Sequence, residues 1–403
     1  MDALSRPRLY RRIAALSALT LVAAAALAAG ASAQIGRTSS AGLARPWAAQ
    51  YMNGAETVSA GEAVAAAKEF DVIAALPRVY KPYVGQMKAA NPSLLLFVYL
   101  KGVFTYDTTL PEAAYAHDAH GLRITGLKFP GTWLLDPTSP VAVTTQIAAA
   151  KDLLALSGYD GVFLDTLGPA VMGDGYVTTP PVNPATGQVW TVGGWVGATA
   201  ALAGKIAAGV GKPVMGNGLR NGPNYFGKGA TTSRLLQTGM GGAMAEAWLR
   251  DASARIDDYP SEAEWKLNVD AIADAGAHGG SFFAVTKVWT IGLPTQKSAW
   301  YKFAVASFLL ANDGKAYFTF TEQQGDATAA RSLDKLDLGA PQGAYAKIDN
   351  VYQRSFSDGR VLVNPSDSTY TVPLGGIYFT VEGIPVTSVT LPPHTAEILK
   401  RSL

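Results

Sequence analysis

The sequence contains no cysteine and only four histidines. The absence of cysteine excludes disulfides, thiolate metal sites and cysteine nucleophiles. His117 and His120 lack the HExxH pattern of a zinc protease, and His278 and His394 stand alone. The chain also lacks a G-x-S-x-G elbow and a phosphate-binding P-loop. We therefore predict neither a metal ion nor a cofactor.

Charge is also scarce, because charged residues make up only 16% of the chain and the formal net charge is +2. Residues 1–33 carry Asp2 and four arginines, a net +3, which leaves the rest of the chain near −1. A nearly neutral chain has no basic surface to attract phosphate groups, so we predict no nucleic-acid partner. Hydrophobic residues make up 48%, enough for a large core.

The N-terminus has the three parts of a secretory signal peptide. Arginines precede an apolar run over 13–30, and Ala31-Ser32-Ala33 follows as a cleavage site. We expect residues 1–33 to be removed and the mature protein to be secreted, extracellular or periplasmic, without a membrane association. A signal anchor is the alternative, because the run is nearly long enough to span a bilayer. Residues 34–45 are small and polar, and we expect a flexible lead-in.

Between residue 46 and about 340, short apolar runs alternate with alanine-rich helical stretches. Continuous apolar runs are typical of parallel strands that are buried on both faces. The expected strands are 47–51, 70–75, 94–99, 161–165, 213–217, 242–246, 281–286 and 315–320. The expected helices lie near 61–69, 80–90, 141–156, 194–209, 261–276 and 297–311. Eight such units predict an α/β fold, a (β/α)₈ TIM barrel. A doubly wound open sheet is the alternative, although it usually has fewer strands.

Residues 341–403 differ from the preceding part of the chain. Helical stretches end, and short strand-like pieces are separated by turns such as Ser357-Asp358-Gly359 and Asn364-Pro365-Ser366. We predict a small C-terminal antiparallel β-domain, with strands near 352–356, 360–363, 369–373, 378–381, 387–391 and 395–399.

Active sites of TIM barrels lie at the carboxyl ends of the strands, so the polar residue that ends each apolar run is a candidate. Asp165 ends the fourth run and Glu246 the sixth. Two carboxylates that face each other across the barrel mouth are what glycosidic cleavage requires. The alternatives are a helix cap for Asp165 and an exposed helical position for Glu246.

The roles of the two carboxylates follow from their expected surroundings. Lys101 or Lys287 would keep Asp165 ionised as the nucleophile. The apolar Met244 and Trp248 would desolvate Glu246, which would then act as the proton donor.

Other residues are candidates for binding sugar hydroxyls or for stacking on a sugar ring. Each also has a structural interpretation: a polar residue can end a loop, Asp136 before proline can form a turn, and aromatic residues usually lie in the core. The long segment 166–193 adds Asp174, Tyr176 and Trp190. The predicted substrate-binding residues are Lys101, Asp136, Asn217, Trp248, Lys287 and Trp289.

The segment Gly158-Tyr159-Asp160-Gly161-Val162-Phe163-Leu164-Asp165 resembles the strand-four motif of the endo-α-1,4-polygalactosaminidase family and related bacterial glycoside hydrolases. Leu134-Leu135-Asp136-Pro137, Glu246-Ala247-Trp248 and the C-terminal segment 354–365 are similar too. The resemblance implies a (β/α)₈ barrel with Asp165 and Glu246 as the catalytic pair. The proline-rich segment after Asp165 departs from the family pattern. Thr166-Leu167-Gly168 also differs from the ending of the chitinase motif.

These observations predict a glycoside hydrolase that cleaves α-linked sugars of an extracellular or cell-surface polysaccharide by a retaining mechanism. The alternative is a non-catalytic carbohydrate-binding barrel of the cell envelope, which needs aromatic side chains but not both acids. A barrel isomerase or aldolase is a more distant alternative, because it needs a metal cluster or a Schiff-base lysine inside a strand.

The cleavage site gives a direct test. Secreted protein should begin at or near Gln34, because the small residues before it fit the signal peptidase. N-terminal sequencing of the exported protein checks this. Membrane-bound protein that retains Met1 would favour the signal anchor instead.

Overall fold

The computed structural model describes residues 35–36, 38–49, 57–173, 175–227, 239–323 and 332–403. The predicted signal peptide and Asp174 lie outside these ranges. Among the described residues, no helix has both the length and the apolar character needed to cross a bilayer.

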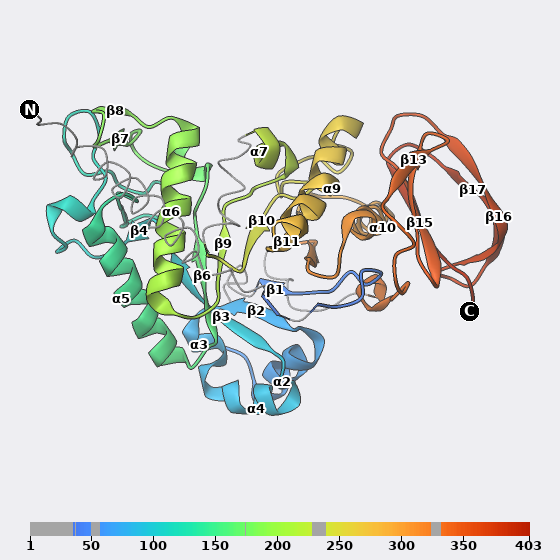
Figure 1. The fold of residues 1–403 in the computed structure, drawn as a ribbon, viewed down its shortest axis with the longest axis horizontal. Coiled ribbons are helices and arrows are strands. Elements are labelled where there is room, and N and C mark those ends of the chain that lie inside the picture. The colour runs from blue at the N-terminus through green and yellow to red at the C-terminus, as the bar shows by residue number, and fades with distance from the viewer. Residues whose placement is uncertain (1–34, 37, 50–56, 174, 228–238, 324–331) are drawn as a thin grey trace, which may run out of the picture.

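The central feature is an eight-stranded parallel sheet with the strand order β1-β2-β3-β6-β9-β10-β11-β12. A parallel bridge between Pro46 and Phe318 joins the two ends of this order, so the sheet closes on itself. The predicted (β/α)₈ barrel is therefore confirmed (Figure 1). Its strands are Ala48–Ala49 (β1), Val72–Ala75 (β2), Leu95–Lys101 (β3), Gly161–Asp165 (β6), Val214–Asn217 (β9), Gly242–Ala245 (β10), Ser281–Lys287 (β11) and Tyr317–Thr321 (β12).

Helices surround the barrel close to the predicted positions. A capping box begins the helix that follows residue 261, since the Ser261 hydroxyl accepts from the Glu264 N–H and the Glu264 carboxylate accepts from the Ser261 N–H. The helix expected over 80–90 is divided by a 3₁₀ turn that contains Pro82, because proline cannot continue the hydrogen-bond ladder. The helices are Ala60–Glu69 (α2), Pro77–Tyr80 (α3), Val84–Ala90 (α4), Pro140–Ser157 (α5), Val192–Val210 (α6), Gly222–Gly227 (α7), Glu262–Ala277 (α9) and Pro294–Ala311 (α10).

The barrel interior is filled by every second residue of the strands, as strand geometry requires. These inward side chains form one buried apolar cluster, in which the Phe283 and Tyr317 rings stack 4.7 Å apart. Its largest members are Trp47, Phe97, Phe163, Met215, Met244, Phe283 and Tyr317. The cluster is a solid apolar floor beneath the carboxyl ends of the strands.

Two residues of the expected lead-in 34–45, Ile35 and Arg45, are buried. Ile35 is 1% exposed and belongs to the interior cluster. Its carbonyl accepts hydrogen bonds from Ser281 and Tyr317 at the amino ends of two strands. Arg45, also buried, is paired with Asp71. The physical reason is that the amino end of the barrel needs an apolar plug, and Ile35 supplies it.

Two long connections rise above the carboxyl ends of the strands. The first follows β3 and contains Phe104–Thr105 (β4) and Trp133–Leu134 (β5). The second follows β6 and contains the hairpin Val182–Asn183 (β7) and Gln188–Val189 (β8). They are joined by backbone hydrogen bonds, including those from Leu127 to Tyr176 and from Val182 to His117. Together they form one wall beside the barrel mouth (Figure 1).

A six-stranded antiparallel sheet follows the barrel, in the order β13-β14-β15-β18-β16-β17, as predicted for the C-terminal region. The Arg354 guanidinium donates to backbone carbonyls at the end of α10, and Lys302 on α10 pairs with Glu397 at 2.5 Å. The sheet therefore packs on the barrel beside α10 (Figure 1). The strands expected at 369–373 and 378–381 form one long strand with a bulge, and the first strand of the sheet was not predicted. The strands are Ala346–Ile348 (β13), Val351–Ser355 (β14), Gly359–Asn364 (β15), Tyr370–Thr380 (β16), Pro385–Leu391 (β17) and Thr395–Lys400 (β18).

Two glycines give a matched test of this packing. A Cβ at Gly161 would lie 2.6 Å from the Phe97 ring and 2.5 Å from the Pro213 carbonyl, so Gly161→Ala should destabilise the fold by about 1–3 kcal/mol. Gly85 lies in α4 with open space around it, so Gly85→Ala should stabilise it by about 0.5–1 kcal/mol. Urea unfolding of both variants measures the difference. Equal stabilities would contradict the close contact at Gly161.

Candidate active site

The polar residues at the barrel mouth continue the inward rows of the apolar floor. Tyr99 and Lys101 follow Phe97 at two-residue spacing on β3, and Asp165 follows Phe163 on β6. Asn217, Glu246 and Lys287 occupy the equivalent positions after Met215, Met244 and Val285. Because alternate residues of a strand share a face, all six side chains point toward the barrel axis. The structure therefore brings together the predicted catalytic pair and three of the predicted binding residues.

One amide group links the two carboxylates. The Asn217 Nδ2 donates to Asp165 Oδ1 at 2.9 Å and to Glu246 Oε2 at 2.7 Å. These two oxygens therefore cannot be more than about 5.6 Å apart, the sum of the two distances. The carboxylates of a retaining glycosidase lie about 5–5.5 Å apart, and those of an inverting enzyme about 6.5–9.5 Å. The pair has the closer spacing.

Asp165 is the buried member of the pair, with 9% of the residue exposed. Its Oδ2 accepts from the Tyr99 hydroxyl at 2.7 Å, opposite the Asn217 bond. Burial, and then the charge of Glu246, raises the pKa of Asp165, while these hydrogen bonds and one from the Thr166 backbone oppose the rise. Burial and the charge of Asp165 also raise the pKa of Tyr99, which therefore remains a donor.

Glu246 is the more accessible member, with 36% of its side chain exposed. The Lys287 ammonium donates to Glu246 Oε1 at 2.5 Å, and its charge also lies 5.1 Å from the centre of the Trp289 ring. Trp289 is half-buried beside it and donates to Thr321. The predicted binding residues Lys287 and Trp289 thus lie next to Glu246.

The physical reasons that we gave for the two roles hold only in part. Lys101 lies beside Asp165, as expected. Lys287 pairs with Glu246 and not with Asp165, and the desolvation falls on Asp165. Met244 lies in the floor below the pair. Asp165 is the last residue of β6 and lies directly on the barrel interior. Glu246 follows the end of β10, where the chain turns outward. Asp165 is therefore buried more deeply than Glu246.

Lys101 lies opposite Asp165 in the register of β3 and β6. Its ammonium is 3.8 Å from the centre of the Phe129 ring, a cation–π contact with the long connection after β3. Burial lowers the pKa of Lys101, and the charge of Asp165 counteracts this. Lys101 is therefore part of the site, held between the buried carboxylate and the wall of the mouth.

Trp248 was predicted to contact the substrate, and this is wrong. The residue is 0% exposed, and its indole N–H donates to the Asn268 carbonyl at 2.8 Å. Its ring packs against Phe308 and Phe318 in the layer between the barrel and its helices. The side chain follows Glu246 by two residues, but the chain has already left the strand, so the inward alternation no longer applies.

Asp136 forms the turn that was the alternative interpretation. Its Oδ1 accepts from the backbone and the hydroxyl of Thr138, two residues further along. Neither bond joins it to the carboxylate pair. Trp190 likewise packs edge-on against the buried Trp195.

Sequence reasoning missed Tyr99, Arg220 and Asp251. Tyr99 could have been found, because it precedes Lys101 by two residues on the same strand. Asp251 lies near the carboxylate pair, because all three acids act on Tyr176 in the connection after β6. Burial first, and then the charges of Glu246, Asp165 and Asp251, raises the pKa of Tyr176 to about 12. Arg220 and Asp251 lie in loops after β9 and β10, where no periodic pattern points to a direction.

The backbone is strained next to the site. Thr166, Arg220 and Leu249 have positive φ angles of 62°, 59° and 62°. Each of the three residues follows a strand that ends at or just before a residue of the site. A non-glycine residue adopts the left-handed backbone region at a cost of about 1–3 kcal/mol. In the described part of the chain, no three His, Asp or Glu side chains are grouped to hold a metal ion.

Solved structures of other proteins are similar to this chain, and the first of them shares its fold. A maltogenic alpha-amylase from Thermotoga neapolitana superposes with a TM-score of 0.53 and 9% identity, over 90% of this chain and 99% of that one. A family 36 alpha-galactosidase from Geobacillus stearothermophilus gives 0.47 and 8%, over 91% and 56%. A comparison with curated proteins found no significant match.

A (β/α)₈ barrel with two facing carboxylates at its mouth is the arrangement that a TIM-barrel glycoside hydrolase requires. Residues 102–360, more than half of the chain, match the model of hypothetical glycosyl hydrolase family 15. The chain belongs to this family. The protein is therefore a glycoside hydrolase, and its substrate is a carbohydrate.

The burial of Asp165 predicts how stability depends on pH. The pKa of Asp165 is raised above its unfolded value of about 3.9, so the folded protein holds the carboxyl proton more tightly than the unfolded chain does. The folded state therefore loses stability as the pH rises from the unfolded pKa to the folded one. Asp165→Asn removes this loss, so its melting temperature relative to wild type should increase as the pH rises above about 4.

Asp107 supplies the control of opposite sign. It is exposed, and hydrogen bonds from Thr109 lower its pKa. Asp107→Asn should therefore lose stability relative to wild type as the pH rises. Thermal unfolding at several pH values measures both trends. A parallel trend for the two variants would contradict the assignment for Asp165.

Proposed function

We propose that the protein hydrolyses α-linked glycosidic bonds by a retaining mechanism, with Asp165 as the nucleophile and Glu246 as the acid/base. The observation that carries the proposal is the short separation of the two carboxylates, which share the Asn217 amide. This spacing leaves no room for the extra water that an inverting pair holds between acid and base.

The nucleophile role fits the surroundings of Asp165. Tyr99 and Asn217 each donate to one of its oxygens, which stabilises the carboxylate despite its burial. In the first step one carboxylate oxygen attacks the anomeric carbon, and the bond from this carbon to the leaving oxygen breaks. The product is an ester between the sugar and Asp165, and the buried position shields it from bulk water.

The acid/base role fits the partial exposure of Glu246. In the first step Glu246 gives its proton to the leaving oxygen. In the second step it takes a proton from a water molecule, whose oxygen attacks the anomeric carbon and releases Asp165. The two inversions restore the original configuration. Lys287 donates to Glu246 and can compensate the charge that appears there when the proton leaves.

The α-linkage is inferred from the placement of the carboxylates on the fourth and sixth barrel strands, which resembles that of α-galactosidase-type retaining enzymes. The narrower resemblance to polygalactosaminidases is a hypothesis about the sugar. Secretion is inferred from the N-terminal sequence alone, and it makes an extracellular or cell-surface polysaccharide the proposed substrate. A carbohydrate-binding barrel without activity is the alternative outcome of the experiment below.

Substitution of the two acids separates their roles. Asp165→Asn should abolish hydrolysis of every glycoside, because no ester can form. Glu246→Gln should slow cleavage of unactivated glycosides by about a hundredfold to ten-thousandfold. It should spare glycosides with activated aryl leaving groups, which need no proton. Azide should partly restore Glu246→Gln by attacking the ester. The readout is kcat/KM on both kinds of substrate.

Three outcomes would contradict the proposal in different ways. The reverse pattern would exchange the two roles. Near-native activity of both variants would remove the pair from catalysis. Binding of oligosaccharides by a wild type that cleaves none of them would favour the non-catalytic barrel. Asp136→Asn is the matched control, because that carboxylate only forms a turn.

A further inference from the structure

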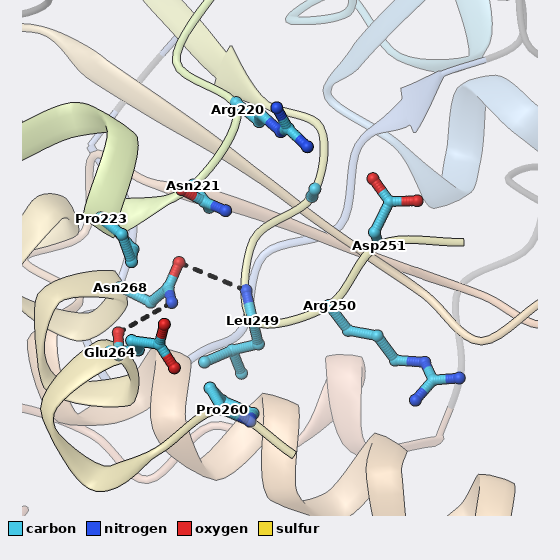
Figure 2. Close-up of a pocket in the computed structure, with 10 residues that line it drawn as sticks. Arg220, Asn221, Pro223, Leu249, Arg250, Asp251, Pro260, Glu264 and Asn268 are labelled. Atoms are coloured by element: carbon cyan, nitrogen blue, oxygen red, sulfur yellow. Dashed lines mark hydrogen bonds between the residues drawn. The ribbon is translucent and has the colours of Figure 1, made fainter. Parts of the chain in front are cut away.

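A pocket adjoins the catalytic pair between the loops that follow β9 and β10. Its volume is about 150 Å³, and Figure 2 shows its lining. Ala247, directly after Glu246, forms part of the wall. Sites for drug-sized ligands measure about 300–1,000 Å³, so this pocket suits one sugar ring better than an oligosaccharide.

Several polar groups of the lining already have structural partners. The Glu264 carboxylate accepts from the N–H and the hydroxyl of Ser261 at the start of α9. The Arg250 guanidinium is buried and donates to backbone carbonyls, among them that of Lys287, and in Figure 2 it points away from Arg220. The Asn268 oxygen accepts from the Gly222 N–H. These groups shape the pocket and are not available to a ligand.

Three other groups are available. Arg220 is exposed, and its guanidinium makes no hydrogen bond to the described part of the chain. Asn221 uses its oxygen to accept from Asn224, which leaves its Nδ2 for a ligand. Asp251 uses Oδ1 to accept from Ser253, which leaves Oδ2. Figure 2 shows Arg220 and Asn221 on one side of the opening and Asp251 on the other.

These groups lie close to the catalytic pair. Burial acts to raise the pKa of Asp251, but hydrogen bonds from Ser253 and the charges of Lys287 and Arg220 outweigh it and lower the pKa. Lys287 is the residue bonded to Glu246. Arg220 and Asp251 also both act on Tyr176, together with the two catalytic carboxylates. The backbone supports this placement, because Ala247, which lines the pocket directly after Glu246, donates its N–H to the Arg220 carbonyl at 2.8 Å. The pocket therefore lies beside the strand end that carries Glu246.

We infer that this pocket binds the sugar unit on the leaving-group side of the scissile bond, held by Arg220, Asn221 and Asp251. The inference rests on the proposed function. Glu246 would give its proton to the leaving oxygen, so the departing sugar must lie on the Glu246 side of the pair, where the pocket is. Guanidinium and amide donors opposite a carboxylate acceptor match neighbouring hydroxyls, each of which both donates and accepts.

The charges specify the class of sugar. Lys101, Lys287 and Arg220 balance Asp165, Glu246 and Asp251 at the mouth when all are ionised, so no net field attracts a charged unit. In the pocket itself, Arg220 is balanced by Asp251. A sugar with a charge of either sign would meet one group that attracts it and one that repels it, so a charge gains nothing here. The pocket therefore favours a neutral, hydroxyl-bearing unit on the leaving-group side, and in this it departs from the amino sugar that the resemblance to polygalactosaminidases implies.

The experiment compares two substrates with the same glycone. The substrates are the para-nitrophenyl glycoside and the disaccharide of whichever neutral sugar the wild type hydrolyses. Arg220→Met and Asp251→Asn should each lower kcat/KM for the disaccharide by about tenfold or more, because each removes a hydrogen bond to a charged group. The para-nitrophenyl glycoside should change by less than about twofold, since its leaving group has no hydroxyls to bind.

The choice of variants keeps folding separate from binding. Asp251→Asn retains Oδ1, the acceptor that Ser253 needs. Arg255→Met and Asp257→Asn are matched controls on the same loop, because this exposed ion pair lies outside the pocket. Both controls should leave the disaccharide and para-nitrophenyl activities unchanged.

The possible failures are distinguishable. Equal losses on both substrates, or no loss on the disaccharide, would overturn the inference about the pocket while the proposed hydrolysis stands. A preference of the wild type for acidic or amino sugars in the leaving position would overturn the selection of a neutral unit. A wild type that cleaves no glycoside in a panel of α- and β-linked substrates would overturn the proposed function and the inference with it.

Discussion

The two-residue alternation of the strands in a closed barrel is the constraint on which the site depends. Inside the barrel, one face of every strand must be apolar and large enough to fill the interior. The same alternation, continued to the carboxyl ends, directs Tyr99, Asp165, Asn217 and Glu246 toward one axis. The apolar floor thus fixes the direction of these candidate catalytic side chains and also keeps water from the space beneath them.

A carboxylate above such a floor is costly unless donors surround it. The strands next to β6 supply these donors, since Tyr99 comes from β3 and Asn217 from β9. Asn217 has two N–H groups at one nitrogen and can therefore satisfy both acids at once. A lysine at this position would neutralise one acid more strongly, but it would not fix the separation of the two. The amide fixes that geometry without adding charge.

The loops at the mouth depend on packing outside the barrel. Arg250, at the pocket, lies 5.0 Å from the centre of the Trp300 ring on α10. Trp300 stacks on Tyr259 at 3.9 Å, and Tyr259 stacks on His394 at 4.7 Å. His394 belongs to the turn between β17 and β18. A continuous stack of side chains thus connects the C-terminal sheet with the loop that carries Asp251, and the sheet supports the wall of the candidate leaving-group pocket.

The sequence by itself determined the barrel, the antiparallel C-terminal sheet and the strands on which Asp165 and Glu246 lie. These features are local: apolar runs, the capping box at Ser261 and turn residues act over a few positions. It also indicated Lys101, Asn217 and Lys287, because each ends an apolar run. The burial of Ile35 and the division of the helix at Pro82 were not anticipated from the same patterns.

Only the tertiary structure decided which lysine pairs with which acid, which acid is buried and where Trp248 points. Trp248 follows Glu246 by two residues, and on a strand this spacing would put both side chains on the same face. The strand has already ended at Ala245, however, and the Trp248 ring enters the layer between the barrel and its helices. Arg220 and Asp251 meet at one pocket only because the loops after β9 and β10 are adjacent in the closed barrel. Such contacts join residues far apart in the chain, and their geometry depends on packing that no local pattern encodes.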